Sequence, residues 1–380
     1  MLAGVASIKA QQTRMNVIGN NLANINTTAF KSSRVTFQDM IAQTLQGATR
    51  PSDGVGGVDP IQIGLGVTIG STGVNEEQGS LNATNNPTDL AIQGNGFFMV
   101  SNGMEVNYTR DGNFTLDAYG NLVSSSTGFK VLGWPANTLG QVDSTSQIDP
   151  KSPANEINIP VGVLKSVQQT TQANFSGNLN AGSSSADSLT TQVTVYDGLG
   201  NPHLISIEFS NHQVPPVGTP PAGATSSWDW SAWEGQPGTG TPIGDSTTTG
   251  NLPLYFDANG ALLTPASSFN ITVPASNGSS SLPIKMDLSQ VSQLGTTSQV
   301  NPTGQNGFPP GSLTNFNIGE DGLITGNFSN GLTRVLGQIA LSNFPNPGGL
   351  EENGNNLWIS TDNSGLPVTG APRSGSNGSI

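Results

Sequence analysis

Glycine-containing turn dipeptides recur along most of this 380-residue chain, and they constrain its fold more than any other feature. Eight Asn-Gly and four Asp-Gly pairs are present, and several separate runs in which apolar and polar residues alternate. Such pairs are the strongest short-range signal for a β-hairpin, because their residues tolerate the backbone angles of tight hairpin turns. The clearest examples lie in residues 96 to 125, 190 to 210 and 316 to 344. The sequence therefore predicts a mainly β protein.

The N-terminal segment has a different periodicity. Residues 1 to about 26 read as an amphipathic helix with a single apolar stripe, formed by Ile8, Met15, Ile18, Leu22 and Ile25. Gly4 and Gly19 each cost about 1 kcal/mol relative to alanine in a helix interior. Such a helix is marginal by itself, so we expect the stripe to need a partner surface.

Composition and charge favour several small domains and a solvated outer region. Hydrophobic residues make up 34% of the chain, which is low for one large core. Five basic side chains against Asp39 give residues 1 to 50 a charge of +4, which leaves −17 for the rest of the total of −13. Residues 166 to 283 contain seven acids and no lysine or arginine. That pattern disfavours binding to nucleic acid or anionic lipid.

Few residues suited to catalysis are present. Cysteine is absent and His203 and His212 are the two histidines, which removes disulfides, thiolate chemistry and Cys/His zinc sites. The glycine-rich stretches lack the spacing of phosphate-binding or dinucleotide-binding loops. We expect no catalytic, cofactor or metal site, no membrane-inserted segment and no cleaved signal peptide.

A tryptophan cluster leaves one alternative open. Trp228 and Trp230 would share one face of a strand, with Trp233 nearby, and such a face stacks on sugars in carbohydrate-binding proteins. The simpler interpretation is that these rings close a small β core, and we favour it. A secreted carbohydrate-binding β-protein stays an alternative from another functional class.

The N-terminal helix ends in a segment that resembles a known family. Residues 15 to 40, "MNVIGNNLANINTTAFKSSRVTFQDM", resemble the signature of the bacterial flagellar rod and hook proteins, an axial family. The matching motif residues are Asn20, Asn21, Leu22, Ala23, Asn24, Phe30 and Lys31. The stretch from 90 to 134 resembles the core domain of that family. Residues 190 to 209 and 307 to 358 resemble its hook members rather than the distal rod protein, which remains an alternative.

The resemblance implies a division of the chain into four parts. We expect an axial helix over residues 1 to 30 and an extended connector over 31 to 75. A discontinuous core β domain would combine 76 to 150 with 305 to 380, and an outer β domain would be inserted over 151 to 304. Relatives continue after the segment that ends here at Ile380 into a second long helix. We therefore expect the N-terminal stripe to lack its partner within this chain.

The resemblance also implies a function. A subunit of this kind polymerises with itself into a curved helical tube that acts as a universal joint and transmits motor torque to the filament. The further partners implied are the distal rod protein, the hook cap, the hook-filament junction proteins and the flagellar export apparatus. The implied location is the extracellular flagellum. The motif, rich in amides and without a nearby acid, base or thiol, is interpreted as a place where one copy docks on another.

Overall fold

The computed structural model describes residues 2–51, 53, 56–137, 140–149, 152–162, 164–216, 218–239, 242–246, 251–263, 267–276 and 278–380. Strands dominate this part of the chain, in which α1 (Leu2–Ala23) is the one α-helix. The predicted mainly β fold with one N-terminal helix is therefore confirmed. Two short 3-10 helices, Pro153–Asn155 and Pro347–Gly349, complete the helical content of the described residues.

The chain forms two compact units. The first unit contains residues 1–160, 316–326 and 334–380, and the second contains 161–315 and 327–333. The four-part division expected from the sequence stays a prediction at its own boundaries. One contact across the insertion is explicit, because Phe98 lies opposite Leu341 in an antiparallel strand pair.

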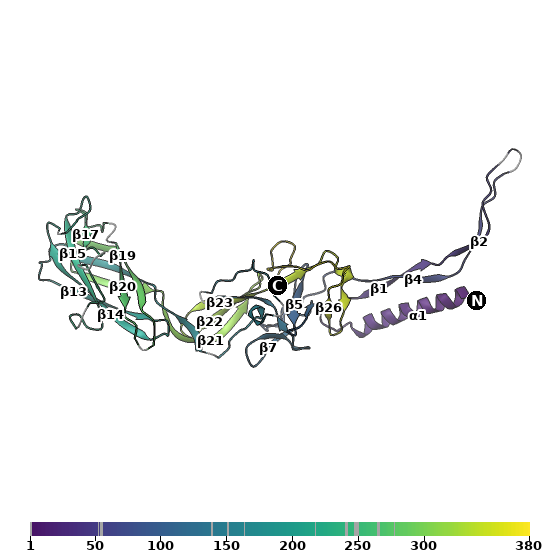
Figure 1. Ribbon diagram of the computed structural model, residues 1–380, viewed down its shortest axis with the longest axis horizontal. Helices are drawn as coiled ribbons and strands as arrows, with labels where there is room; N and C mark the ends of the chain where they lie inside the picture. Colours follow the sequence, from purple (N-terminus) through teal and green to yellow (C-terminus); the bar gives the residue numbers. More distant parts are fainter. Residues whose placement is uncertain are drawn as a thin grey trace. The chain divides into compact units, whose positions relative to one another are not determined.

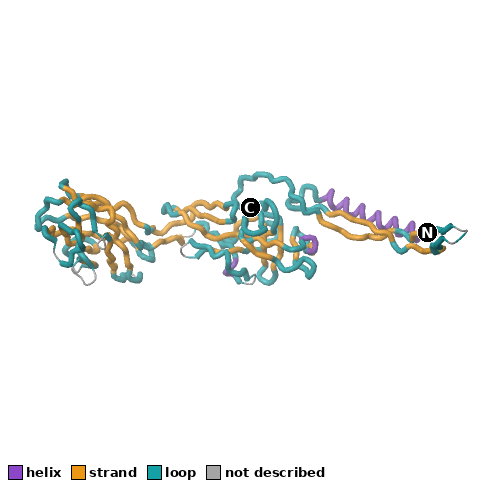
Figure 2. Tube along the Cα trace, turned by 90° about the horizontal axis from the view of Figure 1, so that it is seen from above, coloured by secondary structure: helices purple, strands orange, loops and turns teal. Residues whose placement is uncertain are grey.

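In the first unit, the helix lies along a two-stranded ribbon, as both Figure 1 and Figure 2 show. The ribbon pairs β1 (Ser33–Asp39) with β4 (Val67–Val74) in antiparallel register. Between these strands the chain forms a further hairpin of β2 (Ala42–Gln46) and β3 (Ile61–Gly64). Every residue of β2 and β3 is exposed.

The main sheet of the first unit follows the order β25-β26-β6-β5-β9-β8-β7, and β24 joins β5 to β27. Its core contains Phe97, Tyr108 and Phe344, whose rings meet edge to face. Phe98 meets Phe114 in the same geometry. The strands are β5 (Phe97–Ser101), β6 (Val106–Thr109), β7 (Phe114–Leu116), β8 (Leu122–Ser124), β9 (Lys130–Val131), β24 (Leu341–Asn343), β25 (Glu351–Glu352), β26 (Leu357–Ile359) and β27 (Val368–Gly370).

A five-stranded sheet with the order β10-β23-β22-β21-β11 contains the strands in which the chain passes from one unit to the other. The division falls within β21 and β22 and after the first residue of β23. The bounds are β10 (Gly133–Pro135), β11 (Leu164–Gln168), β21 (Phe308–Ile318), β22 (Leu323–Phe328) and β23 (Thr333–Ile339).

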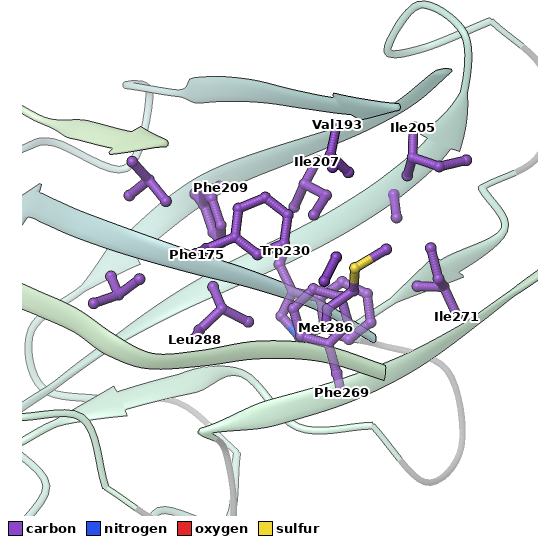
Figure 3. Packing of buried hydrophobic residues seen from close by; sticks show 14 of the residues in the cluster. Phe175, Val193, Ile205, Ile207, Phe209, Trp230, Phe269, Ile271, Met286 and Leu288 are labelled. Carbon is purple, nitrogen blue, oxygen red and sulfur yellow. The ribbon is translucent and has the colours of Figure 1, made fainter. Parts of the chain in front are cut away.

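The second unit packs two sheets around one apolar core (Figure 3). One sheet has the order β18-β19-β12-β20, and the other has the order β13-β14-β15-β16 with β17 paired to β15. Burial alternates along β13, as expected for a strand with one face on a core. The strands are β12 (Gln172–Asn180), β13 (Leu189–Tyr196), β14 (Pro202–Gln213), β15 (Ser226–Glu234), β16 (Gly244–Asp245), β17 (Leu254–Phe256), β18 (Ser268–Val273), β19 (Leu282–Leu294) and β20 (Gln299–Gln305).

Trp228 and Trp230 belong to this core. Trp228 is 1% exposed, Trp230 is 0% exposed and Trp233 is also buried. Trp230 stacks on Phe269 of the facing sheet with ring centroids 3.5 Å apart. The prediction that at least two of these rings are buried is confirmed, and no flat solvent-facing aromatic platform is formed by these three residues.

One turn design recurs in both units and explains many of the glycines. At Asp117, Asp197 and Asp257, the aspartate amide donates to the carbonyl four residues on, and the glycine three residues on donates back to the aspartate carbonyl. The carboxylate accepts two further backbone amides within the loop. The glycine has φ between +77° and +85° in all three loops. This is the hairpin loop with a glycine at the left-handed position, and the aspartate side chain holds it closed.

We predict that Gly120→Ala destabilises the first unit by about 3 kcal/mol and Gly103→Ala by about 1 kcal/mol. Both glycines have positive φ, +81° and +88°. A Cβ at Gly120 would lie 2.5 Å from the carbonyl oxygen of Ile159, whereas a Cβ at Gly103 meets nothing within 4 Å. Chemical denaturation of the two variants measures the difference. Equal losses would contradict the proposed steric contact.

A second prediction concerns His203 in the second unit. Its ring lies 2.6 Å from Glu234 through Nδ1 and 3.4 Å from Asp197 through Nε2. Burial by itself lowers the pKa of His203, but the hydrogen bonds to Glu234 and Asp197 outweigh burial and raise the pKa above its ordinary value. The stabilisation is therefore complete below about pH 6.5 and is lost as the pH rises through the folded-state pKa.

We expect the loss of this contribution to lower the unfolding temperature of the chain as the pH rises above about 6.5. The His203→Gln variant should lose this pH dependence of the unfolding temperature, because a glutamine side chain does not titrate. Glu234→Gln should make the pH dependence smaller. Calorimetry at several pH values compares the three proteins. If the unfolding temperature of His203→Gln changes with pH as much as that of the unaltered chain, the imidazole is not the titrating group.

Candidate self-assembly surface

The helix α1 presents two sides of different character. The five residues of the predicted apolar stripe are all exposed; Ile8, Met15, Ile18 and Leu22 lie on α1, and Ile25 lies in the turn after Ala23. Ile8 is 72% exposed and Leu22 is 68% exposed. Free apolar surface of this extent in one contiguous row is typical of a surface that binds another protein.

The side of the helix that faces the ribbon carries small or polar residues. Ala10 is 4% exposed, and the other half-buried positions follow at helical spacing. These positions are Ala6, Ser7, Thr13, Val17 and Asn21 in the helix and Asn24 just after its end. Small side chains let the helix approach the ribbon closely, but they bury little apolar area. The ribbon therefore holds the helix without using its large apolar residues.

The asparagines at the helix end make local contacts. Asn21 exchanges two hydrogen bonds with the backbone of Ser33, donating to its carbonyl at 2.7 Å and accepting from its amide at 2.9 Å. Asn24 donates to the carbonyl and the side-chain oxygen of Asn20 and accepts from Thr27. These amides satisfy backbone groups where the helix ends and fix the start of β1. Docking of this motif between copies stays a prediction.

Phe30 and Lys31, the last two residues of the motif, lie just before β1 in the chain. Phe30 is half-buried, and Lys31 donates through Nζ to the carbonyl of Glu77 at 2.6 Å. Burial lowers the pKa of Lys31, and the positive charge of Arg110 lowers it further, while Glu76 opposes both effects. Lys31 therefore anchors the connector from a position close to a second cation.

A second exposed apolar region was missed by the sequence reasoning. The hairpin of β2 and β3 exposes Leu45, Ile61 and Ile63, and Ile41 beside it is 79% exposed. An isolated two-stranded hairpin is marginal in water. The available signal was the alternation in residues 61 to 69, "IQIGLGVTI", which was interpreted only as a connector with short strands.

The described residues offer neither a metal site nor a membrane-spanning helix as an alternative to the exposed apolar surface. The described residues contain no group of three or more His, Cys, Asp or Glu side chains that could hold a metal ion. Among these residues, no helix is long and apolar enough to cross a membrane. What the geometry offers instead is unburied apolar surface on α1 and on the β2–β3 hairpin.

Three family models match parts of the chain. Residues 1–31 match the flagella basal body rod protein family. Residues 91–176 match the D1 domain of the flagellar hook protein FlgE/F/G, and residues 164–308 match the D2 domain of the flagellar basal body protein FlaE.

Curated relatives match along almost the whole chain. Flagellar hook protein FlgE of Treponema pallidum is 34% identical, with 96% of this chain and 86% of the relative covered. FlgE of Escherichia coli is 32% identical over 99% of this chain and 87% of the relative. Among solved structures, the Helicobacter pylori flagellar hook protein FlgE2 has a TM-score of 0.50 at 17% identity. It covers 74% of this chain and 94% of that one, which supports the fold.

Proposed function

The chain belongs to the flagellar hook protein family, and from this premise we propose that copies of it build the hook by covering each other's exposed α1 stripe. The family assignment makes the chain a structural subunit of the flagellar hook. The observation that carries the proposal is that the two sides of α1 make different contacts. The small side of the helix contacts its own ribbon, and the large apolar residues stay exposed.

The energy available from this stripe is large on the scale of protein stability. Full burial of a large aliphatic side chain contributes about 1.5 to 3 kcal/mol. Five such residues in one row therefore contribute several kcal/mol to each subunit contact, whereas ordering the helix costs about 1 to 2 kcal/mol per residue before hydrogen bonds are counted. Assembly supplies the burial that the single chain lacks.

The same arrangement suits a polymer rather than a closed oligomer. A stripe on one copy that binds a different surface on the next gives a head-to-tail contact, and such contacts extend into helical filaments. The β units supply stiffness through their packed cores. The second unit has a polar surface that lacks lysine and arginine between residues 166 and 283, so its contacts are hydrated and carry few fixed ion pairs. Contacts of that kind can slide while the tube bends and transmits torque.

The specific partners belong to the same proposal. We infer that the chain meets the distal rod protein at one end of the tube and the hook cap and junction proteins at the other. A helix that becomes stable only in the assembly also suits passage through the flagellar export apparatus in an unfolded state, without a cleaved signal peptide. The role is mechanical, and we propose no catalytic function.

The alternative classes have less support. The carbohydrate-binding interpretation depended on exposed tryptophans, and Trp228 and Trp230 are buried. A distal rod protein is less well supported because the relatives matched over most of the chain are named as hook proteins.

We predict that Ile18→Asp and Leu22→Asp together abolish assembly of the full-length protein and leave the β units folded. Two buried charges without partners cost more than one subunit contact supplies. Circular dichroism reports the folded units, and electron microscopy reports the tubes. The matched control is Gln12→Asp with Asn16→Asp, since both positions are exposed outside the stripe. Tubes from the stripe variant, or none from either variant, would argue against the stripe as the packing surface.

A further inference from the structure

A small cavity in the first unit is lined by groups that suit an anionic ligand. It has a volume of about 220 Å³ and lies where β5, β24 and the chain after β4 come together. Phe97, Phe344 and Pro347 form its apolar walls, and Arg110, Glu76, Asn95 and Asn343 contribute its polar groups. Neither the mainly structural role proposed above nor the α1 stripe uses this cavity.

Arg110 is held rigidly and is only partly satisfied. Its guanidinium carbon lies 5.1 Å from the centre of the Phe97 ring, and Nη1 donates to the carbonyl of Gly94 at 3.0 Å. The Nε atom is buried and finds no acceptor in the part of the chain that the structure describes. A buried donor without an acceptor costs free energy, so the site is poised for one.

The cavity is lined by one cation, Arg110, and one acid, Glu76, and the nearby Lys31, whose Nζ lies 3.4 Å from the carbonyl of Glu76, gives the region an excess of positive charge. Arg110 and Lys31 are close enough for the charge of Arg110 to lower the pKa of Lys31, and Glu76 is the one acid that opposes both effects. Burial is the largest cause of the lowered pKa of each cation. Glu76 forms no ion pair with either cation among the described residues. One further negative charge would balance two cations and one acid.

We propose that this cavity binds the carboxylate of an aspartate or glutamate side chain from an adjoining copy of the chain. The inference rests on the proposed function, because it needs copies to adjoin in a polymer. The guanidinium of an arginine presents paired N–H donors that match a carboxylate.

The charge of the ligand and its source follow from the rest of the chain. A dianion such as phosphate would place a second negative charge beside Glu76, whereas a monoanion neutralises the site. The chain outside residues 1 to 50 carries a charge of −17, and seven acids lie in the run from 166 to 283 without a basic neighbour in sequence. Another copy of the same chain therefore supplies the carboxylate.

The first test uses acetate as the probe and the Nε–H resonance of Arg110 in the ¹⁵N-labelled chain as the signal. We expect acetate to shift this resonance with saturation. Arg110→Gln should weaken acetate binding by about tenfold, observed through neighbouring amides such as that of Phe97. Glu76→Gln should strengthen it by about threefold, since a competing charge is removed. The opposite signs separate a site effect from loss of folding, which would weaken binding in both variants.

The second test measures the critical concentration for assembly by sedimentation. Arg110→Gln should raise it by about tenfold, and Glu76→Gln should lower it. Arg373→Gln is the matched control, because it removes the same charge from an exposed pair with Glu320 that contributes little. Acetate should also raise the critical concentration of the unaltered chain above its value in chloride at equal ionic strength.

The outcomes separate the two proposals. Failure of the unaltered chain to assemble at all would contradict the proposed function itself. Normal assembly of Arg110→Gln, beside normal assembly of the unaltered chain, would overturn the carboxylate site alone. Saturable acetate binding without any effect of Arg110→Gln on assembly would make the cavity a site for free anions and would also overturn the proposal.

Discussion

The structure depends on how α1 divides its contacts. Ala10 and its small neighbours pack against the β1–β4 ribbon, and Asn21 fixes the start of β1 by two hydrogen bonds to Ser33. The large residues Ile8, Met15, Ile18 and Leu22 stay largely exposed. A helix held in this way is positioned but weakly stabilised, because apolar burial supplies most of the stability of helices in proteins. Its full stability must come from another surface.

The two β units, unlike α1, bury their large apolar side chains within themselves. Each has its own buried core, and in the second unit side chains from both sheets meet around Trp230 and Phe269 (Figure 3). The repeated aspartate-closed loops at Asp117, Asp197 and Asp257 keep the hairpins short and well defined. In the proposed account, the chain combines two units that have their own buried cores with a helix that gains its stability from assembly. That combination suits a hook subunit, which must be delivered, ordered on arrival and then loaded mechanically.

Local patterns predicted much of this, and long-range contacts account for what they missed. The turn dipeptides predicted the strands, and the helix predicted to residue 26 ends at Ala23, where Asn24 and Thr27 form the capping turn. The residues of the predicted stripe are exposed. By contrast, the cavity at Arg110 combines groups from residues 76, 97, 110 and 343, which no local period relates. The sequence also did not predict which side of α1 contacts the ribbon, because alanine, threonine and asparagine at helical spacing do not form an apolar face.

The central claim is that α1 is weakly stabilised in the single chain and stabilised by neighbouring copies. Amide hydrogen exchange of residues 4 to 23, compared between the monomer and sedimented tubes, tests it most directly. The account predicts rapid exchange in the monomer, slow exchange in the tubes, and equal slow exchange of the β5 and β14 amides in both. Strong protection of α1 in the monomer, unchanged on assembly, would contradict the claim, because the helix would then owe its stability to its own ribbon.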